Sequence, residues 1–119
     1  MAKPLAENVY DFLLSPKHFT PRPEYVNSSF LVEDDTVLIL AIKQHNIKAV
    51  SILLAAGADP NVPNIKDITP ISVASQKGRI DIMQKLIEYG AVVNAINGSG
   101  STPLIQAAHF GQQLAVELL

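Results

Sequence analysis

The chain has 119 residues, of which 48% are hydrophobic and 17% charged, and its formal net charge is −2 at pH 7. This length fits a single domain that buries roughly two-thirds of the surface of its unfolded chain, and the composition argues against disorder. The near-neutral charge provides no basic surface for nucleic acid, and no apolar run approaches the roughly 18 residues that span a membrane. With no secretory signal pattern and no cysteine, we expect a cytoplasmic or nuclear protein.

Residues 1–30 are predicted to form a helical extension ahead of the rest of the fold. Their apolar side chains recur at the spacing of one amphipathic helix that runs to about Leu14: these are Leu5, Val9, Phe12 and Leu13. Pro16 ends this helix because proline disfavours helical backbone in the residue before it, and the prolines that follow predict an extended segment over His18–Glu24. Two roles stay open for the extension, which either caps the next segment or docks onto a partner.

Residues 31–63 are predicted to hold two short helices joined by a tight turn. The first follows Thr36, and the second ends at Gly57 and buries one face made by Ile47, Val50, Leu53 and Leu54. At the turn between them, a left-handed backbone would cost His45 about 1 kcal/mol. We therefore expect Asn46 to adopt that conformation instead.

Residues 64–96 repeat this order with clearer signals. Thr69 suits a helix N-cap, and Pro70 falls at the first helical position, where a missing N–H group costs nothing. Gly78 fits the left-handed residue that ends a short helix. A second amphipathic helix then runs to Gly90, and its buried face is made by Ile80, Met83, Leu86 and Ile87.

Residues 97–119 begin a third copy of the same order. Thr102, Pro103 and Gly111 take the places of the corresponding threonine, proline and glycine. Leu119 matches a residue that lies three positions before the end of the second helix in the earlier copies. Because that helix then lacks its closing residues and its neighbour, we expect either a fragment of a longer array or self-association through the open end.

A fixed step of 33 residues connects these segments. The Thr-Pro pair at Thr69 recurs at Thr102, and the weaker match at Thr36 precedes both by the same step. Other positions keep the step as well: Ala41, Ala74 and Ala107; Leu53, Leu86 and Leu119; Gly57 and Gly90; Asn61 and Asn94. A period of this length marks stacked supersecondary units, none of which buries its apolar face alone.

Polar residues mark the connections between the units. Loops through Asn61–Ile68 and Asn94–Ser101 are expected to project from the stack, with the amides of Asn61 and Asn94 folded onto turn backbone. The acidic run Glu33–Asp35 is expected to complement the N-terminus of the first helix that follows it. The alternative for this run is a patch for a basic partner.

The repeated strings resemble the ankyrin-repeat family: Thr69-Pro-Ile-Ser-Val-Ala74 with Leu86-Ile-Glu-Tyr-Gly-Ala91, and Thr102-Pro-Leu-Ile-Gln-Ala107. The resemblance covers about residues 31–119, divided into 31–63, 64–96 and a partial 97–119. It implies an all-α solenoid of stacked helix-turn-helix units with projecting hairpin loops and an N-terminal helical cap. It also implies a module that binds another protein.

The sequence offers little for catalysis. Its three histidines, His18, His45 and His109, have no further ligand at metal-site spacing. The absence of cysteine excludes a thiolate nucleophile, and no serine stands in a Gly-x-Ser-x-Gly setting. The sequence therefore predicts no catalytic residue, no metal site and no cofactor.

The family resemblance also implies where a partner protein binds, namely a concave face made by loop tips and the exposed side of the first helix of each unit. By position these residues are Lys43, Gln44, Ile65, Lys66, Ile68, Gln76, Lys77, Ser99, Ser101, His109 and Phe110. Ile65, Ile68 and Phe110 are candidate apolar anchors, unless each packs against its neighbouring loop. Two other functions stay open: the non-catalytic part of a larger enzyme or translocated effector, and a purely structural spacer.

Overall fold

The computed structural model describes residues 5–18, 21–26, 31–98 and 100–119, with side chains from residue 8 onward. Two N-terminal helices, α1 (Leu5–Leu14) and α2 (Pro23–Val26), precede a two-stranded antiparallel hairpin of β1 (Leu31–Val32) and β2 (Asp35–Thr36). Three helix pairs follow: α3 (Val37–Lys43) with α4 (Ile47–Ala55), α5 (Pro70–Gln76) with α6 (Ile80–Glu88), and α7 (Pro103–His109) with α8 (Gln113–Leu118). The predicted all-α architecture is confirmed, with the short hairpin as its only described sheet.

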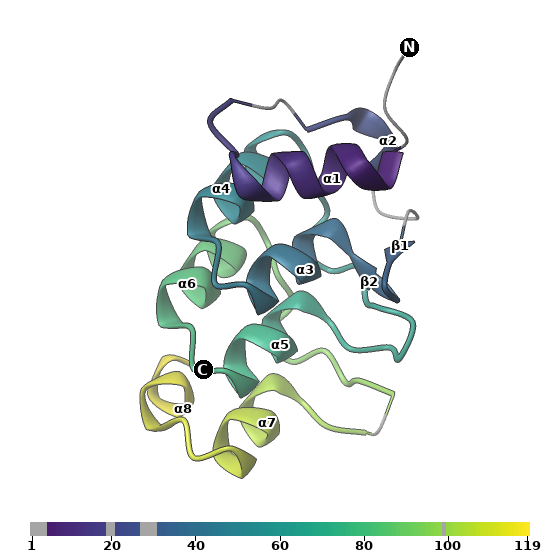
Figure 1. Cartoon of the computed structure of the whole chain (residues 1–119). Helices are drawn as coiled ribbons and strands as arrows, with labels where there is room; N and C mark the ends of the chain where they lie inside the picture. Colours follow the sequence, from purple (N-terminus) through teal and green to yellow (C-terminus); the bar gives the residue numbers. More distant parts are fainter. Residues whose placement is uncertain (1–4, 19–20, 27–30, 99) are drawn as a thin grey trace.

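The helix pairs stack in one direction and form two layers (Figure 1). The inner layer contains α3, α5 and α7, the outer layer contains α4, α6 and α8, and the loops project from the inner layer on one side. Helix α5 packs against both α3 and α7, and α6 packs against both α4 and α8. The result is an elongated solenoid with principal extents of 47 × 25 × 21 Å.

Local signals begin and end the inner helices as predicted. The side chain of a threonine caps each of them by accepting a backbone N–H bond: Thr36 from Ile39 at 3.1 Å, Thr69 from Ser72 at 3.4 Å and Thr102 from Ile105 at 3.3 Å. The glycines that follow α5 and α7 have positive φ angles, 65° at Gly78 and 68° at Gly111. Because the caps and glycines are local features, they are readable from the sequence.

The turn between α3 and α4 contradicts one prediction. His45 adopts the left-handed backbone (φ 53°), whereas Asn46 does not (φ −92°). The Asn46 side chain makes two hydrogen bonds: its Oδ1 accepts the Ala49 N–H at 3.2 Å and its Nδ2 donates to the Leu13 carbonyl at 2.7 Å. His45 keeps a partner of its own in Asp81, whose Oδ2 lies 3.2 Å from Nε2. Two hydrogen bonds from Asn46 outweigh the strain at His45.

One hydrophobic core runs through the whole stack between the inner and outer layers. Three alanines of the inner helices, Ala41, Ala74 and Ala107, are fully buried. Their small side chains let neighbouring inner helices approach each other closely. Larger side chains fill the space between the layers, among them Ile42, Leu53, Ile71, Ile82, Met83 and Leu86. No unit buries its apolar face without a neighbour, as the period implied.

The N-terminal segment contributes to the same core. Val9, Phe12 and Leu13 on α1 are buried, and the Phe12 ring lies 6.3 Å from that of Tyr25 on α2. The Tyr25 hydroxyl donates to Asn8 Oδ1 at 3.0 Å, and burial raises the pKa of this phenol. The buried face of α1 is as predicted, except that the side chain of Leu5 lies outside the described residues.

The extended segment predicted over His18–Glu24 is wrong in its last part. Helix α2 begins at Pro23, where proline supplies a helical φ and loses no hydrogen bond. The helix buries Tyr25 and Val26 against the core, a tertiary gain that the local proline pattern did not reveal. The boundaries at residue 30 and between 31–63, 64–96 and 97–119 stay predictions, since the stacked units share one core.

Candidate protein-binding surface

The loops that project from the inner layer are fastened to one another by backbone hydrogen bonds. The Ile65 N–H donates to the Asp34 carbonyl at 3.0 Å, and the Gly98 N–H donates to the Asp67 carbonyl at 3.1 Å. Asp34 and Asp67 both have positive φ angles, 71° and 61°. The two bonds are equivalent in successive units, so each loop tip rests on the tip before it.

A buried asparagine organises each of the two later loops. The Asn64 Oδ1 accepts the N–H groups of Lys66 and Ile68, both at 3.0 Å. The Asn97 Oδ1 accepts the Ser101 N–H at 3.0 Å. Asn64 and Asn97 keep the same 33-residue step, and this was the signal in the sequence that would have identified them.

The predicted role of Asn61 and Asn94 is half correct. Asn61 bonds turn backbone, but in the following unit: its Oδ1 accepts the Val92 N–H at 2.8 Å and its Nδ2 donates to the Gly90 carbonyl at 3.2 Å. The exposed Asn94 side chain makes no such bond within the described residues. The Asn61 amide therefore reaches forward and connects its own turn to the turn of the following unit.

Asp35 belongs to a polar network rather than to the first turn of α3, which contains no acidic residue. Its carboxylate is buried, with Oδ2 at 2.8 Å from Lys43 Nζ and Oδ1 accepting Asn64 Nδ2 at 3.0 Å. The network joins the hairpin, the first inner helix and the second loop. Lys43 pairs with the Asp35 carboxylate, and the role of the acidic run Glu33–Asp35 beside the N-terminus of α3 stays a prediction.

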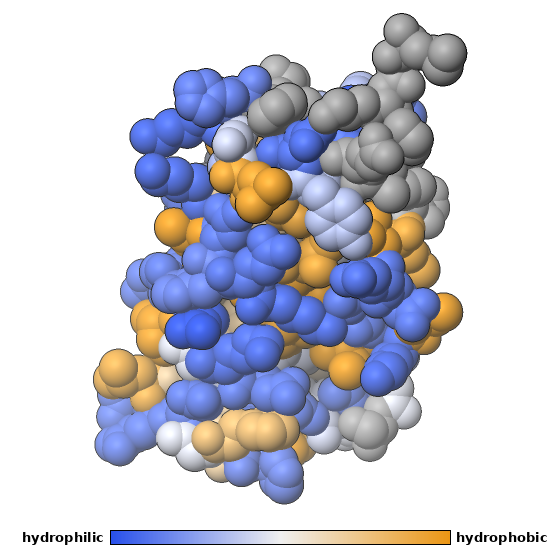
Figure 2. Space-filling view, in the orientation of Figure 1, coloured by the Kyte–Doolittle hydropathy of each residue, from blue (hydrophilic) through white to orange (hydrophobic). Residues whose placement is uncertain are grey.

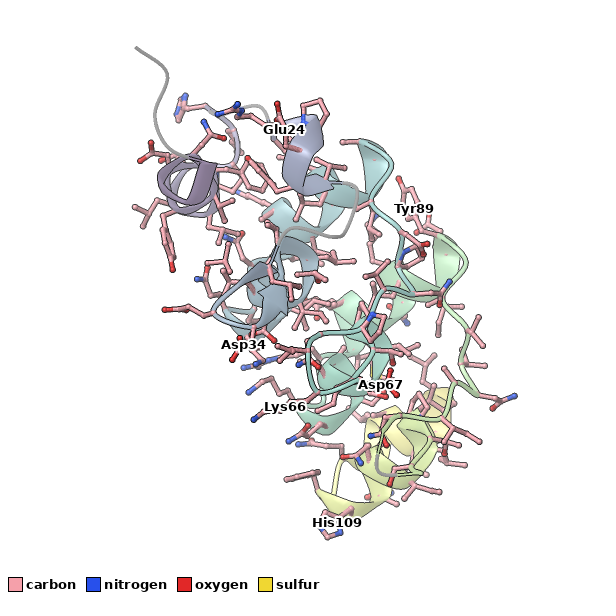
Figure 3. The ribbon with its side chains drawn as sticks, turned by 90° about the vertical axis from the view of Figure 1, so that its right-hand side faces the viewer. Glu24, Asp34, Lys66, Asp67, Tyr89 and His109 are labelled. Atoms are coloured by element: carbon pink, nitrogen blue, oxygen red, sulfur yellow. The ribbon has the colours of Figure 1, made fainter. Side chains whose placement is uncertain are left out.

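Charged side chains cover the inner-layer face. Lys43 ends the inner helix of the first unit, whereas Lys66 and Lys77 lie in the loop and at the C-cap of the inner helix of the second unit; all three are exposed. In Figure 3, Asp34 and Lys66 lie on the left-hand side of the molecule with His109 at its lower end, whereas Tyr89 lies on the right. In Figure 2 the surface over α3 and α5 is mainly hydrophilic. These exposed lysines make part of the inner-layer face positively charged.

Of the three candidate anchors, two are exposed. Ile65 is 62% exposed and Phe110 is 47% exposed, and the Phe110 ring meets His109 edge-on at 5.0 Å between centroids. Ile68 is partly buried and packs against the core. The alternative interpretation therefore holds for Ile68, which supports its own loop.

The remaining predicted contact residues differ in how far their side chains are exposed. Gln44 and Lys77 are exposed C-cap residues of α3 and α5, whereas Gln76 is half-buried and its carbonyl accepts Gln112 Nε2 at 3.2 Å. Ser101 is half-buried at the base of its loop. Ser99 lies outside the described residues.

The described residues offer neither a metal site nor a membrane span. No group of three or more histidines, aspartates and glutamates is placed to hold a metal ion there. In the same part of the chain, no helix combines the length and apolar character that crossing a bilayer requires.

Stacked helix pairs, projecting loops and a continuous core define a helical repeat protein of the solenoid class. The family model described as ankyrin repeats matches residues 38–119 in three copies. This chain therefore belongs to the ankyrin-repeat family.

Similar proteins are much longer than this chain. It is 35% identical over 97 residues to the 2-5A-dependent ribonuclease of Mus musculus, a match that covers 78% of this chain and 13% of the ribonuclease. It is 30% identical over 86 residues to the human transient receptor potential cation channel subfamily A member 1, a match that covers 71% of this chain and 8% of the channel subunit. It is 30% identical over 102 residues to the serine/threonine-protein kinase VIK of Arabidopsis thaliana, a match that covers 83% of this chain and 23% of the kinase. The chain thus spans less than a quarter of the length of each of these relatives.

Proposed function

We propose that this chain is a protein-binding module that catalyses no reaction and holds a partner against its inner-layer face. The observation that carries the proposal is the combination of three exposed lysines, Lys43, Lys66 and Lys77, with the exposed apolar side chains of Ile65 and Phe110. Large exposed apolar side chains among charged neighbours are typical of interface anchors. A partner with acidic residues around an apolar centre would complement this surface.

The rigidity of the face supports the same proposal. The loop tips rest on one another through the bonds from Ile65 and Gly98, and Asp35 holds Lys43 at 2.8 Å. Side chains held in place by the scaffold lose less conformational entropy when a partner binds. A spacer without a binding site would have no need of exposed apolar groups on this face.

A second candidate is the non-catalytic ankyrin portion of a larger enzyme or effector. It is favoured by the relatives, of which the matched segment forms only 13%, 8% and 23%. In that case the same face would bind another domain of the longer polypeptide or a separate protein. For either candidate we propose a cytoplasmic or nuclear location, in keeping with the absence of cysteine.

The test is a quantitative pull-down with two matched double variants. The face variant combines Phe110→Ala with Lys77→Glu. The control combines Tyr89→Ala, which lies on the opposite side of the molecule from Lys66 in Figure 3, with Glu88→Lys at the neighbouring position. Each pair removes one exposed aromatic ring and reverses one exposed charge. A partner retained by the wild type and the control but lost by the face variant would support the proposal.

The affinity of that partner is then measured by calorimetry. We expect the face variant to weaken binding by more than about 2 kcal/mol if Phe110 is an anchor, with an unchanged unfolding transition. Equal binding by the folded face variant and the wild type would exclude this face as the binding surface.

A further inference from the structure

A cavity of about 340 Å³ lies on the outer-layer side, where the segment after α1 meets the start of α4. Its lining includes Leu14, Pro16, Lys17, His18 and Lys48. In Figure 2, hydrophilic surface gathers at the upper left, over this junction, well away from the projecting loops on the right in Figure 1. The cavity is therefore separate from the proposed partner-binding face.

The floor of the cavity is held together by a hydrogen bond between distant segments. Asn46 Nδ2 donates to the Leu13 carbonyl at 2.7 Å, which fastens the end of α1 to the start of α4. The Asn46 Oδ1 caps α4 through the Ala49 N–H. Both basic segments are thus fixed to one another, so their relative position is a property of the fold.

Two lysines of this junction lie side by side. Both line the cavity and the recess beside it, and the Lys17 side chain lowers the pKa of Lys48, because two ammonium groups are both donors and repel each other. Within the described residues neither lysine forms an ion pair with a carboxylate. Two neighbouring ammonium groups without a counter-charge create a site where an anion relieves the repulsion and pairs with both.

Further features of the junction favour an anion with an organic part. The imidazole of His18 adds a third nitrogen group to the lining, and Lys48 lies in the first turn of α4, near the positive end of that helix. A second recess of about 240 Å³ shares Lys17 and Lys48, and its other lining residues include Ile47 and Ile52. Apolar surface therefore continues beside the two ammonium groups.

We propose that this junction is a binding site for a phosphate monoester. Above about pH 7 such a phosphate is mostly a dianion, which matches the two ammonium groups of Lys17 and Lys48. A phosphate bound by lysines takes them as point charges, without the planar geometry that arginine requires. The organic group of the ester lies against the apolar wall formed by Ile47 and Ile52.

The test is a titration of the 119-residue chain followed by two-dimensional amide NMR. The probes are phenyl phosphate, inorganic phosphate and benzyl alcohol. We expect saturable shift changes confined to residues 13–18 and 46–52, tighter binding of phenyl phosphate than of inorganic phosphate, and no binding of benzyl alcohol. Added sodium chloride should weaken the interaction, because the two ammonium groups are exposed and therefore screened by salt.

Two double variants separate this site from general attraction of anions. Lys17→Gln with Lys48→Gln should weaken phenyl phosphate at least about tenfold, since charge-assisted hydrogen bonds to both groups are lost. Lys66→Gln with Lys77→Gln removes the same charge from the opposite layer and should leave the affinity unchanged. Equal losses in both variants, or no saturable change up to about 10 mM ligand, would overturn the proposal.

A final comparison identifies the source of the phosphate. O-phosphoserine is compared with a peptide that carries phosphoserine at its centre and an apolar residue on either side. Tighter binding of the peptide would assign the site to a phosphorylated segment of another protein. Equal binding would assign it to a small phosphate ester, and failure of both to compete with phenyl phosphate would contradict the assignment of the site to monoesters of biological origin.

Discussion

The strongest test of the N-terminal segment is the substitution Phe12→Ala. The Phe12 side chain is fully buried and contacts the ring of Tyr25, so truncation removes core packing and leaves a cavity. Buried phenylalanine-to-alanine substitutions cost about 3–5 kcal/mol, against a total stability of about 5–15 kcal/mol for a small domain. Leu14→Ala is the matched control, because Leu14 lies on the same helix and is 84% exposed.

Urea unfolding followed by circular dichroism measures both variants. With an m-value of about 2 kcal/mol/M, Phe12→Ala should lower the midpoint by about 1.5–2.5 M, whereas Leu14→Ala should change the free energy of unfolding by less than about 0.5 kcal/mol. Because end units of a solenoid unfold more easily than its centre, part of the loss is expected as an early separate transition. Deletion of residues 1–30 should likewise lower the melting temperature or cause aggregation.

A midpoint for Phe12→Ala that matches the Leu14→Ala control would refute the capping argument. It would mean that α1 contributes nothing to the stability of the stack in solution. The docking-segment alternative would then be the better account of residues 1–30. An unchanged melting curve after their deletion would lead to the same conclusion.

Three further predictions concern the repeats themselves. Asn64→Ala should destabilise the chain by about 2–4 kcal/mol, because it leaves two backbone N–H groups of its loop without their acceptor; the exposed Asn94→Ala is its control, and both are measured by urea unfolding. His45→Gly should be neutral or stabilising by up to about 1 kcal/mol in the same assay, because glycine relieves the left-handed strain (φ 53°). Leu104→Glu with Leu114→Glu should reduce any self-association seen by light scattering across a concentration series, because these side chains are 44% and 67% exposed on the last helix pair.

Each of these predictions has a clear contrary result. Equal stability of Asn64→Ala and Asn94→Ala would show that the loop hydrogen bonds are replaced by water at no cost. A loss of more than about 1 kcal/mol in His45→Gly would show that the pair with Asp81 is worth more than an exposed ion pair normally is. Association that is equal in the wild type and the double glutamate variant would place the contact on another surface.

Much of the helix pattern is determined by the sequence alone, and the reason is that its signals are local. The N-cap of Thr69 satisfies a backbone group only three residues away, and Gly78 ends its helix through its own φ angle. Such interactions need no knowledge of distant segments. Repetition of the same signals every 33 residues then indicates the stack.

The predicted binding face was only partly readable from sequence, because exposure depends on neighbouring units. Ile65 and Ile68 are both isoleucines of one loop, yet the first is 62% exposed and the second packs against the core. No local pattern distinguishes them. The direction of each side chain is set by the way Asn64 folds its loop.

Only the tertiary structure determined those features that depend on contacts between segments far apart in the sequence. Asn46 keeps a negative φ angle and His45 adopts the left-handed backbone. The reason is that the Asn46 amide donates to the Leu13 carbonyl, 33 residues away. Pro23 begins a helix because Tyr25 and Val26 are buried against the core. Lys17 and Lys48 become neighbours for the same reason, since packing of α1 against the stack joins two segments that the sequence keeps apart. Local hydrogen bonds thus determine where the repeated helices begin and end, whereas contacts between distant segments determine the turn at His45, the helix at Pro23 and the cavity beside α1.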